Sequence, residues 1–292
     1  DGMDQSKWSI PRCRGDRYSK TFEQLERPRI KVHGLWCHYR ELMFFCADPR
    51  TAADSDFIIE CAARGLERIA AQCRESGAPM PTEVTIWCDN TVRESKNTWV
   101  LTFLSALVLK MKMKFAALCM SMVGHTHGCL DQIYGQLTVC FRYCSVLLDC
   151  DDVCSKIKDC LEKMKIHRWI GPDCKVHCEY VKCVRDWKSW LSKLHFSGGL
   201  RDNSESGIHS MMFLRRVDIP SNLRVTSFGR AAQTLPEHPS DVVCLVKRHA
   251  SDANLFQEVM LAVPYVRLSR LPPLPTRPKP FKKIPVEKKR VG

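Results

Sequence analysis

The sequence predicts an α/β protein in which a mixed β-sheet is flanked by helices. Two short apolar runs, at 84–88 and 115–123, have the length and composition of buried strands. A polar stretch follows each run, and a segment with helical periodicity follows each polar stretch. A region at 30–47 that is rich in β-branched and aromatic residues precedes both runs. This order of strands and helices is typical of sheets covered by helices.

The first predicted elements are a hairpin and a long helix. Residues 30–39 and 41–47 predict two strands that pair as a hairpin. Residues 54–73 predict an amphipathic helix, because their apolar side chains recur at roughly helical spacing. We expect Ser55 to cap this helix, and Gly77 with the prolines that follow to end it.

The middle of the chain is expected to continue the alternation of strands and helices. The strand at 84–88 is expected to be buried on both faces because of its apolar composition. The longest uncharged run, 98–109, is too short to cross a bilayer, so it predicts a core helix and no membrane association. The expected elements are a helix at 97–111, a strand at 115–123 and a helix at 129–148.

Beyond residue 150 the patterns are weaker. Helices are expected at 153–163 and 184–194, and strands at 210–215 and 242–247. The final segment is rich in proline and lysine, and it predicts an extended, disordered basic arm. The expected parts are a core at 1–150, a smaller α+β extension at 151–270 and the tail at 271–292.

The charge of the chain points to a polyanionic partner. Lys and Arg number 45 against 32 Asp and Glu, which gives a formal net charge of +13. A basic excess of this size favours nucleic acid, and the alternative is a soluble basic protein with a basic tail.

The 17 cysteines predict buried, reduced thiols in an intracellular protein rather than a disulfide scaffold. Many of them stand among apolar residues, as Cys46 and Cys119 do. A zinc site is left open as an alternative at one group of possible ligands, although their spacing fits no standard paired-ligand pattern. These residues are Cys174, His177, Cys178 and Cys183.

Three acidic residues are candidate ligands for a divalent cation. Asp89 follows the strand at 84–88, Asp131 lies one turn into a helix, and Asp1 precedes the hairpin. Carboxylates at the ends of strands gather at sites in α/β proteins, and Mg²⁺ prefers oxygen ligands. Two such ions about 4 Å apart can activate water or a DNA 3′-hydroxyl. Spacing alone does not select these three, because the chain holds 32 acidic residues.

Two motifs resemble those of an uncharacterised eukaryotic family of transposon-derived proteins. The motif at 89–97 reads Asp-Asn-Thr-Val-Arg-Glu-Ser-Lys-Asn, and the motif at 124–132 reads Gly-His-Thr-His-Gly-Cys-Leu-Asp-Gln. The opening Asp-Gly-Met-Asp-Gln also resembles the first motif of that family. The sequence departs from the pattern at Ser95, where Asn is usual, and at Gly128, where an acidic residue is common. The resemblance is close over residues 1–140 and extends loosely to 220, and neither departure removes a candidate carboxylate.

The resemblance implies a ribonuclease H-like core of the DDE/DDD transposase type that uses Mg²⁺ or Mn²⁺. In such cores the first Asp lies on strand one, the second after strand four, and the third acid on a following helix. Asp1, Asp89 and Asp131 match these places, with Asp4 as the rival of Asp1. The strand that carries the first Asp is then mostly missing from the chain, and the core would be truncated there.

Other polar residues adjoin the two motifs. His125 and His127 either assist a metal or phosphate, or cap and pack the start of the helix that carries Asp131. The polar residues after the strand at 84–88 either contact phosphates or form a turn, and these are Asn90, Arg93, Lys96 and Asn97.

Four tryptophans are expected to be structural. We expect Trp87 and Trp99 to lie in the core rather than on a surface that stacks on bases. Trp187 and Trp190 are three residues apart and predict one packed helix face.

The leading hypothesis is a metal-dependent DNA strand transferase or endonuclease, since phosphodiester attack needs positioning and charge neutralisation more than a nucleophilic side chain. The alternative is a domesticated, catalytically silent protein that binds nucleic acid. A proofreading-type exonuclease is disfavoured, because Met3 stands where those enzymes carry Glu.

The same hypothesis gives expectations for where the protein is located and how it assembles. We expect a nuclear protein whose partner is DNA, and a homo-oligomer is left open. Because the chain begins with Asp1 rather than Met, we expect it to be part of a longer protein.

Overall fold

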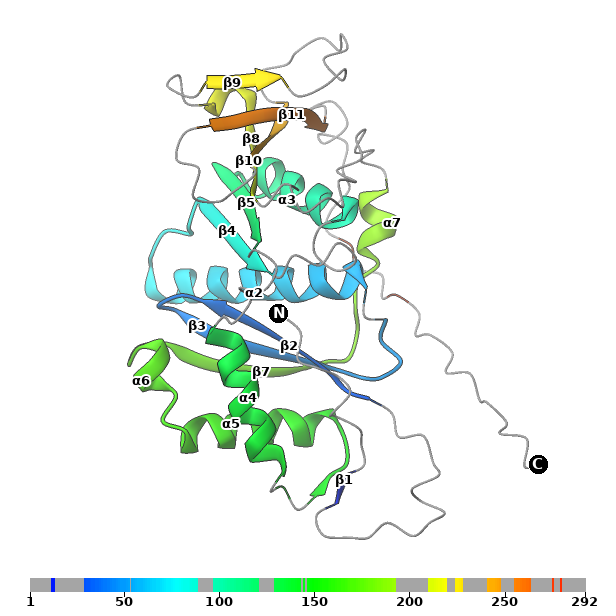
Figure 1. Ribbon diagram of the computed structural model, residues 1–292, viewed down its shortest axis with the longest axis vertical. Helices are drawn as coiled ribbons and strands as arrows, with labels where there is room; N and C mark the ends of the chain where they lie inside the picture. The colour runs from blue at the N-terminus through cyan, green and yellow to red at the C-terminus, as the bar shows by residue number, and fades with distance from the viewer. Residues whose placement is uncertain are drawn as a thin grey trace, which may run out of the picture.

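The computed structural model is a mixed α/β protein (Figure 1). In the part of the chain that the structure describes, the strands form two mixed sheets and one short two-stranded ribbon. No helix among the described residues is long and apolar enough to cross a membrane. The described residues are 12–13, 29–52, 54–88, 97–120, 129–142, 144, 146–192, 210–219, 224–227, 241–247, 255–263, 275 and 279.

The first sheet has three strands in the order β2-β3-β7. β2 (Lys31–Cys37) and β3 (Glu41–Ala47) form the predicted antiparallel hairpin, and β7 (Lys175–Val181) pairs with β3 in parallel. All seven residues of β3 are buried, because it is the central strand and both faces of the sheet are covered.

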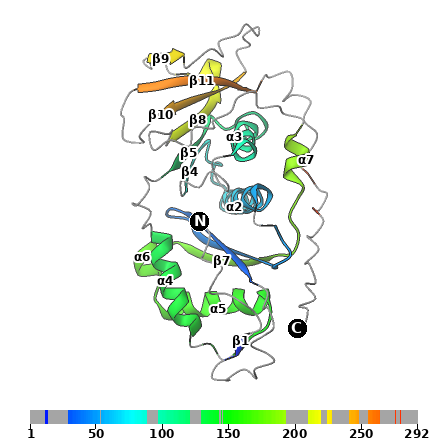
Figure 2. The ribbon, with the colours of Figure 1, turned by 45° about the vertical axis from the view of Figure 1, so that its right-hand side comes forward.

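Helices cover the two faces of this sheet (Figure 2). α2 (Ser55–Ser76) lies on one face, and α4 (Cys129–Arg142) and α5 (Cys150–Lys163) lie on the other. α6 (His167–Ile170) is a single turn that follows α5.

The second sheet has six strands in the order β4-β5-β8-β10-β11-β9. β4 and β5 are parallel, β8 pairs with β5 and β10 in antiparallel fashion, and β11 pairs antiparallel with β10 and parallel with β9. Strands from before and after residue 150 therefore share both sheets. The strands are β4 (Glu83–Cys88), β5 (Phe115–Met120), β8 (Ser210–Arg215), β9 (Arg224–Ser227), β10 (Val242–Lys247) and β11 (Leu255–Val263).

α2 separates the two sheets in both views (Figure 1, Figure 2). It packs Phe57 and Cys61 against the three-stranded sheet, and Ile59 and Ala63 against the core under the six-stranded sheet. That second core also contains α3 (Thr98–Lys110) and α7 (Trp187–Leu191). A helix buried on two sides gives the molecule its layered arrangement.

The ends of α2 show how local sequence sets its length. The expectation that Ser55 caps the helix was wrong, because Asp54 is the N-cap and accepts a hydrogen bond from the backbone N–H of Asp56. Gly77 ends the helix in the left-handed region, with a φ of 67° that favours glycine.

Most predicted elements of the central and C-terminal regions were confirmed, with changed ends. The helix predicted at 129–148 ends at Arg142, and β6 (Val146–Leu147) follows it and pairs with β1 (Arg12–Cys13). The helix predicted at 184–194 is the shorter α7. Its two tryptophans, Trp187 and Trp190, are both buried with ring centroids 5.9 Å apart, as their spacing predicted.

The prediction that the strand at 84–88 is buried on both faces was wrong. β4 is the edge strand of its sheet, and its residues alternate between exposed and half-buried. The expectation that Trp87 belongs to the core was also wrong, since its side chain is 60% exposed. Trp99, in contrast, packs against the buried core as expected.

Candidate functional site

A cavity of about 370 Å³ lies between β2, α2, β4 and the first turn of α4. Most of its wall is apolar, with side chains of α2 such as Leu66 and Ile69. The aromatic and polar groups that line it include Trp36, His38, Trp87, Cys88 and Asp131. Large apolar pockets with a few polar groups are the usual form of ligand sites.

The position of α4 beside the cavity depends on a close approach to β2. Tyr134 of α4 is buried, and its hydroxyl is hydrogen-bonded to the backbone of Gly34. A Cβ atom at position 34 would lie 2.5 Å from the Tyr134 Oη, so only glycine allows this contact. Burial raises the pKa of the Tyr134 phenol well above its usual value, so the group stays neutral.

Asp131 precedes Tyr134 by three residues and therefore lies on the same side of α4. It is half-buried on the cavity wall, in the first turn of the helix. The positive end of the helix dipole favours a carboxylate at this place. Asp131 also adds a negative charge near Tyr134 that raises the pKa of the phenol further.

The end of β4 reaches the same cavity. Cys88 is the last residue of the strand and lines the cavity together with Asp131. Its thiol points to the carbonyl oxygen of Cys119, with 3.8 Å between the two atoms, which ties β4 to β5. The next residue, Asp89, lies outside the described residues. The fold thus brings Asp131 to the place where the strand before Asp89 ends.

Most of the other predicted site residues also lie outside the described part. Asn97 is described, and it caps α3 by accepting hydrogen bonds from the backbone N–H groups of Trp99 and Val100. The geometry therefore gives Asn97 the role of a polar residue at the start of a helix. The residues outside the described ranges are Asp1, Asp4, Asn90, Arg93, Lys96, His125 and His127.

The four residues considered for zinc do not gather in one place. His177 and Cys178 are neighbours on β7, so their side chains point to opposite faces of the sheet. His177 Nε2 lies 3.2 Å from a carboxylate oxygen of Glu179, while Cys183 is exposed. Cys174 is buried and belongs to the core beside α5.

Sequence reasoning missed a network of buried acids at the start of α2. Glu60 is completely buried and accepts hydrogen bonds from Arg64, Arg185 and the indole of Trp187. Burial would raise the pKa of Glu60, but the hydrogen bonds and charge of Arg185 outweigh burial and lower it. Arg185 and Trp187 are each more than 100 residues from Glu60, so the sequence holds no local signal for these two contacts; only the pair with Arg64, four residues along α2, is local.

The same network includes a residue of the predicted tail. Lys279 donates hydrogen bonds to Asp54 and Asp56, and its backbone N–H donates to the carbonyl of Val184. Lys188 also pairs with Asp54. These acids are neutralised by cations, which marks them as structural rather than as a second metal site.

The cavity lies in a region that a family model recognises. The model for the domain of unknown function DUF7869 matches residues 20–206, which is more than half of the chain. The chain belongs to the DUF7869 family. The DUF7869 region includes the whole three-stranded sheet, α2 to α7 and every residue that lines the cavity. No curated protein and no solved structure matches the chain significantly.

Proposed function

We propose that this DUF7869 protein is a metal-dependent enzyme that acts on DNA phosphodiesters, as a strand transferase or nuclease with a ribonuclease H-like, transposase-derived core. One observation carries the proposal: Asp131 and the end of β4, directly before Asp89, share one cavity. These are the two places at which the transposon-derived family carries its second and third acids.

The residues present suit a hard divalent cation. Asp131 offers a carboxylate from a half-buried position, and Asp1 and Asp89 are the further ligands in the proposal. Oxygen donors of this kind fit Mg²⁺ or Mn²⁺. The cation would supply activation of the attacking water or 3′-hydroxyl and stabilisation of the leaving oxygen.

The surroundings of Asp131 suit a nucleic acid. Trp87 lines the cavity and is 60% exposed, so its ring is accessible for stacking on a base. The net charge of +13 favours contact with phosphates. A nuclear location and association into homo-oligomers are further parts of the same proposal.

The test is a DNA cleavage and strand-transfer assay with the purified chain in Mg²⁺, Mn²⁺ or Ca²⁺. Cleavage is expected with Mg²⁺ and Mn²⁺, and Asp131→Asn and Asp89→Asn are each expected to lower the rate by several orders of magnitude. Asp159→Asn is the matched control, because Asp159 is an exposed helical carboxylate that does not line the cavity. Full activity of either Asn variant at the site would refute the assigned ligands.

A catalytically silent DNA-binding protein is the second candidate function. Asp131 is the one carboxylate among the described residues that line the cavity, and the rest of the wall is mainly apolar. Under this alternative, the wild-type chain would bind DNA with a steep dependence on salt but would cleave it with none of the three metals.

A further inference from the structure

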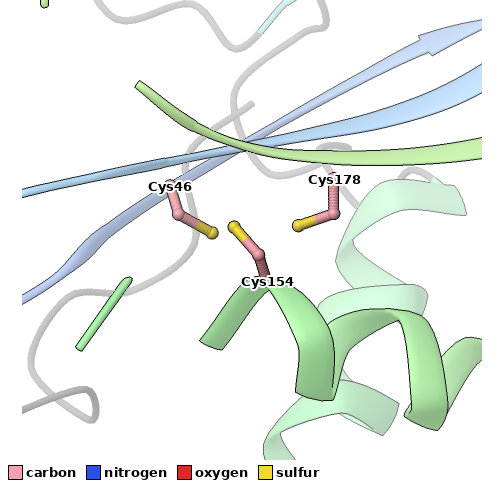
Figure 3. A group of neighbouring side chains, drawn as sticks. All are labelled: Cys46, Cys154 and Cys178. Carbon is pink, nitrogen blue, oxygen red and sulfur yellow. The ribbon is translucent and has the colours of Figure 1, made fainter. Parts of the chain in front are cut away.

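Three cysteine side chains converge in the core between the three-stranded sheet and α5 (Figure 3). Cys46 comes from β3, Cys154 from α5 and Cys178 from β7. Their sulfur atoms all lie within 4.8 Å of one another, and all three residues are buried. We call these three residues the sulfur cluster.

The fold places these sulfurs together through pairing and packing. Cys46 of β3 stands opposite Tyr180 of β7, so Cys178 lies two positions along the neighbouring strand, on the same face. α5 packs against this face and turns Cys154 toward both strands, as Figure 3 shows. Three separate elements therefore supply one sulfur each.

The sulfurs interact with one another in the free protein. The thiols of Cys178 and Cys46 donate hydrogen bonds to Cys154, which lowers the pKa of Cys154 and raises the pKa of the two donors. A metal ion binds the deprotonated form of such thiols, so binding at the sulfur cluster would release protons.

We propose that the sulfur cluster is a buried binding site for a soft, thiophilic cation, Cu⁺ or Zn²⁺. Thiolates select these ions over hard cations such as Mg²⁺. Metal–sulfur bonds of about 2.3 Å in a planar triangle place the sulfurs about 4.0 Å apart. The observed separations of at most 4.8 Å need little movement to reach this arrangement.

The number of ligands distinguishes the two ions. Among the described residues, no further His, Cys, Asp or Glu ligand atom joins the group. Structural zinc sites almost always have four ligands, and the three buried sulfurs supply only three. Three sulfurs in a plane satisfy Cu⁺, so Cu⁺ is expected to bind more tightly than Zn²⁺ at the sulfur cluster.

This site is independent of the proposed DNA chemistry. It lies on the α5 side of the sheet, and none of its residues lines the cavity that contains Asp131. A chain that fails to cleave DNA could therefore still bind Cu⁺ at the sulfur cluster, and a chain that fails to bind Cu⁺ could still cleave DNA.

The experiment is a competition titration of the reduced, full chain with Cu⁺ under anaerobic conditions, using a chromophoric Cu⁺ chelator, with a parallel Zn²⁺ titration. The expected result is one equivalent of Cu⁺ that resists the chelator, with an ultraviolet sulfur-to-metal charge-transfer band. Cys154→Ala and Cys178→Ala are each expected to weaken this binding at least about a hundredfold.

The matched control is Cys61→Ala. Cys61 is also completely buried beside β3, but it lies on the α2 side of the sheet and outside the sulfur cluster. This control is expected to keep the Cu⁺ equivalent. Circular dichroism of each variant, and Cys154→Ser as a closer isostere, separate loss of ligand from loss of fold.

Two outcomes would overturn the proposal. One is Cu⁺ binding that is equally strong in folded Cys154→Ala, Cys154→Ser and wild-type protein. The other is a loss of Cu⁺ affinity that is equally large in Cys61→Ala and in Cys154→Ala. Tighter binding of Zn²⁺ than of Cu⁺ at the same residues would overturn the three-ligand geometry.

Discussion

The two faces of the three-stranded sheet are made by the same strands and are both packed with apolar side chains, but they differ in their polar groups. Toward α2, charged groups pair across the interface, as Glu41 does with Arg68 and Glu179 with Arg64. Toward α4 and α5, the sheet presents apolar side chains and the sulfurs of Cys46 and Cys178.

The difference shows how strand alternation separates two kinds of chemistry by one residue. On β7, His177 and Glu179 face α2, whereas Cys178 between them faces α5. Apolar contacts together with ion pairs hold α2 in place, whereas apolar contacts with one close backbone approach hold α4. The two faces should therefore respond differently to loss of a charge, to added volume and to acid.

The largest effect on stability is expected for Glu60→Ala on the α2 side. This change leaves Arg64 and Arg185 without their buried acceptor, so the free energy of unfolding should fall by about 3–5 kcal/mol. Urea denaturation measures it. Glu67→Ala is the control, because Glu67 pairs with the same Arg185 but is 49% exposed and should cost about 1 kcal/mol or less. Equal costs for the two variants would contradict a buried network.

A smaller effect is expected on the opposite face for Gly34→Ala. The added Cβ meets the Tyr134 Oη at 2.5 Å, so Tyr134 must move and the free energy of unfolding should fall by about 1–3 kcal/mol. Removing the hydroxyl relieves the clash, so the same change should cost less in a Tyr134→Phe background. A double-mutant cycle from chemical denaturation tests this. If the losses in free energy of unfolding for Gly34→Ala and Tyr134→Phe were additive, the contact between Gly34 and the Tyr134 hydroxyl would not affect stability.

Acid should weaken the α2 side in two stages. Burial lowers the pKa of His33 well below 6.5, so the unfolded chain takes up a proton that the folded chain does not, and stability falls as the pH drops below 6.5. Although burial opposes ionisation of Glu60, Arg185 holds its pKa below 4.5, and the stability from this ionised group is lost as the pH falls further. Urea midpoints measured across this range test both stages.

His33→Phe is the variant that separates the two stages. In this variant the free energy of unfolding should no longer change between pH 6.5 and 4.5, but it should still fall below pH 4.5. If the free energy of unfolding of His33→Phe still fell between pH 6.5 and 4.5 as in the wild type, another group would titrate there.

The smallest effect on stability is expected for Trp87→Ala, which lies on neither face and gives a baseline. An exposed side chain on an edge strand should change the free energy of unfolding by no more than about 0.5 kcal/mol. Affinity for single-stranded DNA should nevertheless fall by about tenfold, because a stacking surface is lost. Fluorescence anisotropy measures the affinity, and an unchanged value would remove Trp87 from the proposed DNA site.

The sequence by itself determined the local elements. Periodicity predicted the hairpin of β2 and β3, the helices α2, α3 and α5, and the strands β8 and β10, because these patterns arise between near neighbours. The pairing of Trp187 with Trp190 is another relation of this kind. The fold class follows from the order of these elements, and it was confirmed as mixed α/β.

The tertiary structure alone decided which elements meet. Composition did not reveal that β4 is an edge strand, because exposure depends on the neighbours of a strand in the sheet. The contact of Cys46 with Cys154 and that of Glu60 with Arg185 join residues more than 100 positions apart, and such contacts leave no local pattern. The same holds for the cavity, where Asp131 and the end of β4 meet because α4 packs on the three-stranded sheet, with Tyr134 against Gly34.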